Sequence, residues 1–197
     1  MAHNNIEVEI KIKLTKTKFE KIKGKLPKIA KIGKTSHHID SYYNPIYKSF
    51  LKPKYPYEWL TIRVRDGAVK LNYKHWHPEG SKNTTHCDEL ETEIADKLQM
   101  EKILKALHFD NFVTIDKKRI TYIYKNELEI ALDQVKGLGY FIEVESIKNT
   151  GGVKKAHEKL LEFLRKELDI KETKTIPGGY ASEMMRKRKN KPRNQLT

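Results

Sequence analysis

Hydrophobic and polar positions alternate one by one along much of this chain. Residues 6–14 set the pattern, with Ile, Val and Leu on one parity and Glu, Glu, Lys and Lys on the other. Because successive side chains of a strand point to opposite faces, the segment predicts a strand with one apolar and one charged face. Further strands are expected at 28–33, 36–44, 59–65, 69–76, 86–94, 112–124, 127–133 and 140–147.

Helical periodicity and turn residues complete the pattern. Apolar residues recur at helical spacing in 16–26, 95–108 and 153–168, which predicts three amphipathic helices, and a short last helix is expected over 180–186. Asp66-Gly67 predicts a hairpin between the strands beside it, because this pair suits a type I′ turn. Prolines at 45, 53 and 56 predict a loop over 45–57.

The ionisable residues of the predicted strands share a single parity in strand after strand. Because the three helices must cover an apolar face, the charged face is expected to turn inward. The pattern therefore predicts an α+β fold, a closed antiparallel β-barrel with a polar lumen and amphipathic helices outside. The residues expected on the charged face are Glu7, Glu9, Lys11, Lys13, Arg63, Arg65, Lys70, Lys74, Glu89, Glu91, Glu93, Lys117, Arg119, Glu127, Glu129, Asp133, Glu143 and Glu145.

A lumen with charges of both signs suggests a chemistry. Carboxylates suit Mg²⁺ or Mn²⁺, and Arg and Lys suit phosphate. A metal ion beside several phosphate-facing cations is the usual apparatus of phosphoryl transfer. The net charge of +14 also favours a polyanionic partner.

Composition sets further bounds. The 197 residues suit one domain. The single cysteine, Cys87, excludes an internal disulfide and is typical of a reducing cytoplasm. No apolar run is long enough for a membrane span or a signal peptide, so a cytoplasmic protein without a membrane partner is expected.

The C-terminal segment differs from the rest. In residues 186–197, six of twelve positions are Lys or Arg, which predicts a flexible basic tail after a folded domain of residues 1–185. The tail could contact nucleic acid, or it could be a solvated end. The second interpretation is favoured, because no aromatic residue lies among the charges to stack on bases.

Several motifs together resemble the CYTH, or triphosphate tunnel metalloenzyme, superfamily. The resemblance covers about residues 5–185 and is closest to the class IV adenylyl cyclase-like branch. The first motif is Glu7-x-Glu9-x-Lys11. The others are Asp40-Ser-Tyr42-Tyr43, Arg63-x-Arg65, Lys74, Lys118-Arg119 with Tyr122, Glu129 to Asp133, Gly137-Leu-Gly139 and Glu143-x-Glu145.

The resemblance implies an eight-stranded antiparallel tunnel that holds a triphosphate, with Mg²⁺ or Mn²⁺ as cofactor. The metal ligands implied are Glu7, Glu9, Glu91, Asp133, Glu143 and Glu145. The triphosphate-binding residues implied are Lys11, Arg63, Arg65, Lys74, Lys118 and Arg119, of which Lys11, Arg63, Arg65 and Arg119 form the catalytic group. Two assignments stay open, because the motif can be placed one strand step earlier or later. The triphosphate-binding lysine is Lys70 or Lys74, and the acidic residue is Glu89 or Glu91.

The expected activity is metal-dependent hydrolysis of a small-molecule triphosphate, either inorganic or carried by a nucleoside or other organic group. Cyclisation of ATP to cyclic AMP and pyrophosphate is the first alternative. Non-catalytic binding of polyphosphate or a nucleotide is the second, and it is disfavoured because a pure anion binder gains nothing from rows of carboxylates. The sequence leaves open whether the protein acts alone or as a homodimer.

Overall fold

The computed structural model describes residues 6–148, 151–171, 176 and 178–189. Within these residues, nine strands, four α-helices and one short 3₁₀ helix follow one another along the chain. Their order is β1 (Ile6–Glu7), β2 (Glu9–Leu14), α1 (Lys16–Lys25), the 3₁₀ helix η1 (Leu26–Lys28), β3 (Lys31–Pro45), β4 (Glu58–Arg65), β5 (Ala68–His77), β6 (His86–Glu93), α2 (Lys97–Ala106), β7 (Phe109–Tyr124), β8 (Leu128–Val135), β9 (Gly139–Ser146), α3 (Val153–Lys166) and α4 (Gly179–Lys189).

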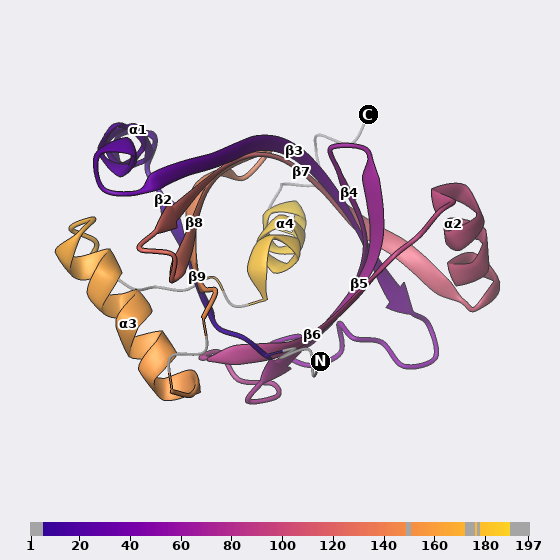
Figure 1. The fold of residues 1–197 in the computed structure, drawn as a ribbon. Helices are drawn as coiled ribbons and strands as arrows, with labels where there is room; N and C mark the ends of the chain where they lie inside the picture. Colours follow the sequence, from indigo (N-terminus) through magenta and orange to yellow (C-terminus); the bar gives the residue numbers. More distant parts are fainter. Residues whose placement is uncertain (1–5, 149–150, 172–175, 177, 190–197) are drawn as a thin grey trace.

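The strands form one antiparallel sheet that closes on itself. Its order is β1-β6-β5-β4-β3-β7-β8-β9-β2. Only Val8 separates β1 from β2, so residues 6–14 pair with β6 on one side and with β9 on the other. Figure 1 shows the resulting ring of strands. The predicted barrel is confirmed, with nine strands in place of eight because the first strand divides at Val8.

Two tight turns set the register of neighbouring strands. Asp66 and Gly67 both have positive φ, 49° and 85°, between β4 and β5. Lys125 and Asn126 have φ of 51° and 53° between β7 and β8. Positive φ at both central positions is the type I′ geometry, whose twist matches that of the flanking strands. The hairpin predicted at Asp66-Gly67 is therefore confirmed.

The strands expected at 28–33 and 36–44 are a single strand, β3. Its pairing with β7 shifts register between Ile32 and Thr35, where Gly33 lies. A Cβ on Gly33 would lie 3.0 Å from the carbonyl oxygen of Thr121, so the two backbones approach too closely for a side chain. This irregularity is a bulge within one continuous strand. It interrupts the alternation of the sequence, which is why the sequence predicted two strands.

Three helices cover the outer, apolar face of the barrel, as the sequence predicted (Figure 1). Helices α1 and α3 pack against β2, β8 and β9, and Phe19, Ile22, Leu160 and Leu164 join the largest hydrophobic cluster of the described residues. On another side, Leu104 of α2 packs with residues of β3 and β4. The burial of the apolar parity outside leaves the charged parity facing the lumen.

The fourth helix has a different position, within the ring of strands (Figure 1). Its Tyr180 and Ala181 are buried with Trp59 and Phe141, which closes that end of the barrel with an apolar cluster. The helix runs to Lys189, so residues 186–189, assigned above to the tail, continue α4. Lys187 donates to the carbonyl oxygen of Gly137 at 2.5 Å, and the rest of the predicted tail lies outside the described residues. No described helix is long and apolar enough to span a membrane.

The packing of α3 on the barrel gives a stability prediction. Leu160 is completely buried in the largest cluster, so Leu160→Ala should lower the free energy of unfolding by about 2–5 kcal/mol. Leu98→Ala in α2 is the matched control, because Leu98 is 67% exposed and should cost well under half as much. Urea denaturation measures both, and equal losses would contradict the packing described here.

Candidate active site

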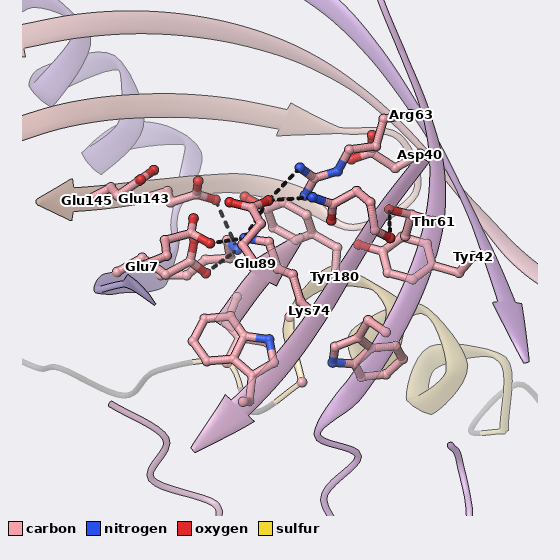
Figure 2. A pocket seen from close by; sticks show the side chains of 18 of the residues that line it. Glu7, Asp40, Tyr42, Thr61, Arg63, Lys74, Glu89, Glu143, Glu145 and Tyr180 are labelled. Carbon is pink, nitrogen blue, oxygen red and sulfur yellow. Dashed lines mark hydrogen bonds and ion pairs between the residues drawn. The ribbon is translucent and has the colours of Figure 1, made fainter. Parts of the chain in front are cut away.

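The lumen contains a cavity to which most of the strands contribute charged side chains. Within the described part of the chain, eight carboxyl groups and six basic side chains line it. The carboxylates are Glu7, Glu9, Asp40, Glu89, Glu91, Glu129, Glu143 and Glu145, and the basic residues are Lys11, Arg63, Arg65, Lys74, Lys117 and Arg119. Figure 2 shows several of them converging from opposite walls.

Arg119 of β7 is the most firmly fixed cation in the lumen. Its Nε and Nη2 atoms donate to the two oxygens of Asp133 at 2.8 and 2.6 Å, and Nη2 also reaches Glu143 at 3.0 Å. Tyr180 of α4 donates to Asp133 at 2.7 Å. Burial opposes the charge of Arg119, but Asp133 and Glu143 hold its pKa well above the usual value. This bidentate pair stays ionised and orients the guanidinium.

Lys11 and Lys74 link the carboxylates of neighbouring strands. The Lys11 ammonium lies 2.9 Å from both Glu9 and Glu143. Lys74 contacts Glu7 and lies 3.6 Å from Glu89. Because the first strand pairs with β6 at one end and β9 at the other, these lysines span the closing seam of the barrel.

Arg63 faces the acidic residues of β6. Its Nη1 atom lies 3.0 Å from Glu89 and 3.2 Å from Glu91, and Asn72 of the strand between them donates to Glu89 at 2.6 Å (Figure 2). Arg63 is thus held in the lumen by two carboxylates. Its remaining donors are available to an anion in the cavity.

Three ionisable groups of the lumen have no ion-pair partner among the described residues. Arg65 is one, and its buried Nε atom lacks a hydrogen-bond partner there too. Glu129 and Glu145 are the others, and they lie opposite each other in a row with Glu9 across β8, β9 and β2. Burial, then the charges of Glu7 and Glu9, raises the pKa of Glu145 to about 9. Two carboxyl groups and one guanidinium that line the same cavity thus have no ion-pair partner among the described residues, which suits ligands of both signs.

Lys117 is buried between Asp40 and Asp133, at 3.9 and 3.5 Å from their oxygens. Burial, and then the neighbouring Arg119, lowers the pKa of Lys117 to about 8. The Tyr180 ring lies between the ammonium groups of Lys117 and Lys11, 5.0 and 4.9 Å from its centroid. Helix α4 therefore contributes directly to the electrostatics of the cavity.

Ten of the twelve residues that the sequence marked as metal-binding or triphosphate-binding line this cavity, and two do not. Lys118 is exposed on the outer face of β7, because its parity is opposite to that of Lys117 and Arg119. The neighbouring Lys117, and not Lys118, points into the lumen. Asp133 is completely buried, and Arg119 and Tyr180 occupy its oxygens, so it anchors Arg119 rather than facing the cavity.

Position distinguishes the residues in one of the two choices left open. Lys74 lines the cavity, whereas Lys70 lies outside its lining and pairs with Glu91 at 2.8 Å. Both Glu89 and Glu91 line the cavity.

The sequence-based site residues omitted several residues of the lining, among them three charged residues and Tyr180. Asp40 and Glu129 stood in the motifs, and Lys117 stood on the charged parity, so their signals were present. Tyr180 stood in a C-terminal element that the sequence placed outside the core charge set, since nothing in its helix indicates that α4 enters the barrel.

Comparison with known proteins agrees with this architecture. The family model of the CYTH domain matches residues 5–180. The chain belongs to the CYTH domain family. It is 35% identical over 178 residues to a protein of Methanocaldococcus jannaschii described as a candidate adenylate cyclase, which covers 89% of this chain and 96% of the relative.

Two solved structures of this CYTH fold are informative. The Pyrococcus horikoshii protein PH1819 has 30% sequence identity and a TM-score of 0.74, covering 92% of this chain and 99% of its own. A candidate adenylyl cyclase from Hippeastrum, described as having a dominant triphosphatase activity, has 19% identity and a TM-score of 0.60, covering 84% and 88%. At this identity the second likeness concerns the fold alone.

The family implies a divalent metal ion, and the lumen residues fit one in charge and donor type. Eight of the lining side chains are carboxyl groups, which outnumber the six basic side chains. The row of Glu9, Glu145 and Glu129 offers the oxygen donors that Mg²⁺ and Mn²⁺ prefer. Among the described residues, no three acidic, His or Cys side chains already converge on one point, because Lys11 and Lys74 hold several of the oxygens. Metal binding therefore requires these lysines to release carboxylates.

The raised pKa of Glu145 gives a pH prediction for the metal-free protein. The folded state keeps a proton on Glu145 that the unfolded chain releases, so this group contributes stability that is lost as pH rises from about 4.5 to about 9. Glu145→Gln should therefore flatten the pH dependence of the free energy of unfolding over this range, measured by urea denaturation with EDTA. Glu158→Gln, at an exposed position of α3, should keep the wild-type slope. An unchanged slope in Glu145→Gln would show that its carboxyl ionises normally.

Proposed function

We propose that this protein is a divalent-metal-dependent enzyme that acts on a triphosphate inside the barrel, with hydrolysis as its reaction. The observation that carries the proposal is the composition of one cavity, in which a row of three carboxyl groups, two of them without an ion-pair partner, lies together with several fixed cations. A simple anion-binding site has no use for the carboxylates, and a simple metal site has no use for the cations.

The basic residues of the lumen bind the phosphate groups. Arg65 is the first candidate, because its guanidinium has no carboxylate partner to give up among the described residues. Arg63 and Arg119 are oriented by Glu89 and Asp133 and keep further N–H groups for phosphate oxygens. A planar guanidinium binds two such oxygens at once, which fixes the chain of phosphates along the lumen.

The carboxylates supply the metal site. Glu7, Glu9 and Glu145 are the proposed ligands, with Glu129 and Glu143 beside them. A divalent ion held there provides Lewis-acid polarisation of the phosphoryl group. Substrate and metal exchange partners with the resting network, because phosphate can take over Lys11 and Lys74 as they release Glu9, Glu143 and Glu7.

Water as the nucleophile gives hydrolysis. Its oxygen forms a bond to a phosphorus atom, the bridging P–O bond breaks, and the leaving phosphate takes the electron pair while a proton is released. Lys117, whose pKa is about 8, can exchange a proton near neutral pH at the cavity wall. Arg63, Arg65 and Arg119 stabilise the charge that develops on the phosphoryl oxygens.

Cyclisation of ATP is the second candidate function. It uses the same lumen charges, with a ribose hydroxyl as the nucleophile and pyrophosphate as the leaving group. The description of the Methanocaldococcus jannaschii relative as a candidate adenylate cyclase favours it. The Hippeastrum protein, which shares the fold, is described as having a dominant triphosphatase activity.

A product assay tests the proposed function. Purified protein is incubated with ATP or inorganic triphosphate, with Mg²⁺ and separately with Mn²⁺, and the products are separated by chromatography. Release of phosphate supports hydrolysis, whereas cyclic AMP with pyrophosphate replaces it by cyclisation. Saturable triphosphate binding without any product would leave only a binding protein.

Two neighbouring lysines give a matched pair of variants. Lys117→Met removes a lumen cation and should lower kcat/KM about 100-fold or more, because a positioned charge is lost from the phosphate grip. Lys118→Met changes the exposed face of the same strand and should keep kcat/KM within about twofold. Steady-state kinetics with a thermal melt of each variant separates activity from folding. A larger loss in Lys118→Met would reverse the assignment of faces.

A further inference from the structure

One part of the cavity is apolar, and the charged groups do not explain it. Its aliphatic and indole lining residues, among those described, are Pro56, Trp59, Trp76 and Ile176. The two tryptophans and Ile176 belong to one hydrophobic cluster, so these residues lie together. The chain has two tryptophans, and both line this cavity. An inorganic triphosphate carries no group that could use this surface.

The two tryptophans differ in how much of the ring is free. Trp59 is 5% exposed, and its ring stacks on Phe112 and meets the edge of Tyr42, with centroids 6.4 and 5.8 Å apart. Trp59 is therefore committed to the cluster that closes the barrel. Trp76 is only partly buried, and among the described residues no aromatic ring stacks on it. Of the two indoles, Trp76 therefore keeps more ring surface for a planar ligand, on the part that the Lys74 ammonium does not cover.

The position of Trp76 connects it to the phosphate-binding residues. Trp76 and Lys74 lie on the same lumen face of β5, two residues apart, which is about 6.6 Å along a strand. The Lys74 ammonium lies 5.8 Å from the centre of the Trp76 ring. A group stacked on Trp76 can therefore belong to the same molecule as a phosphate bound by Lys74.

The surroundings of Trp76 hold it in place. Its backbone N–H donates to the carbonyl oxygen of Tyr57 at 2.7 Å, which ties β5 to the end of the loop before β4. Pro56 of that loop and Thr84 of the loop after β5 both line the cavity. The Thr84 side chain adds a hydroxyl, a hydrogen-bond donor and acceptor, to an otherwise apolar seat.

We propose that Trp76 seats the neutral base of a nucleoside triphosphate, so that the substrate class is nucleoside triphosphates rather than inorganic triphosphate. This inference rests on the proposed function and narrows it. Stacking of a base on an aromatic side chain is sequence-tolerant and strong enough to set preference. A cationic heterocycle is disfavoured, because the Lys74 ammonium already lies over the indole.

Binding measurements with two ligands test the proposal. Wild-type protein and Trp76→Ala are titrated by calorimetry with ATP and with inorganic triphosphate, using Ca²⁺ in place of Mg²⁺ to slow turnover. Trp76→Ala should weaken ATP binding about tenfold and leave inorganic triphosphate within about twofold, because only ATP carries a base. Tyr47→Ala is the control, since this aromatic residue is 70% exposed and outside the cavity lining, and it should change neither affinity.

Tryptophan fluorescence provides an independent readout. In Trp59→Phe, Trp76 is the sole tryptophan, and its emission should change more with ATP than with inorganic triphosphate, because both ligands bind Lys74 beside the ring but only ATP stacks on it. Equal loss of both ligands in Trp76→Ala, or no loss of either, would overturn the base seat. Wild-type protein that binds inorganic triphosphate but not ATP would overturn it while the proposed function stands. Wild-type protein that binds neither ligand would overturn both.

Discussion

The closed barrel imposes one constraint on everything else, which is that a full row of charged side chains points away from bulk water. Buried charges are costly unless each has a partner. The lumen meets this cost with a network in which Arg119 clamps Asp133 and Glu143, and Lys11 joins Glu143 to Glu9. The network also defines the site, since the few charges that it leaves unpaired, among them Arg65 and Glu145, are the groups for which ligands have to be found.

The fold and the lumen set could be predicted because alternation is a local property. Residues two apart on a strand share a face, so Glu7 and Glu9, or Glu143 and Glu145, needed no three-dimensional information. Lys118 was misassigned for the opposite reason, since its motif was given more weight than its parity. The bulge at Gly33 was also misread, because a close backbone approach resembles a break between strands when only the sequence is visible.

Other features could not be predicted, because they depend on contacts between distant parts of the chain. Asp133 belongs to the charged parity, but its role as an anchor requires Tyr180 of α4. That α4 enters the barrel while α1, α2 and α3 stay outside follows from the fit of Tyr180 and Ala181 against Trp59 and Phe141. Positive φ at Gly178 and Gly179 lets the chain turn into this helix next to Trp59, where a Cβ on Gly178 would come within 3.2 Å of the indole.

The seam of the barrel has a consequence for folding kinetics. Residues 6–14 precede all the other strands in the chain, yet Glu9 pairs with Glu145, 136 positions further along the sequence. Contacts between such distant positions form late, because the loop between them must close first. The carboxylate row is therefore assembled only when the last strand, β9, reaches the first one. A nascent or partly opened chain has most of its strands but no complete row of carboxylates, so this site reports whether the whole barrel has closed.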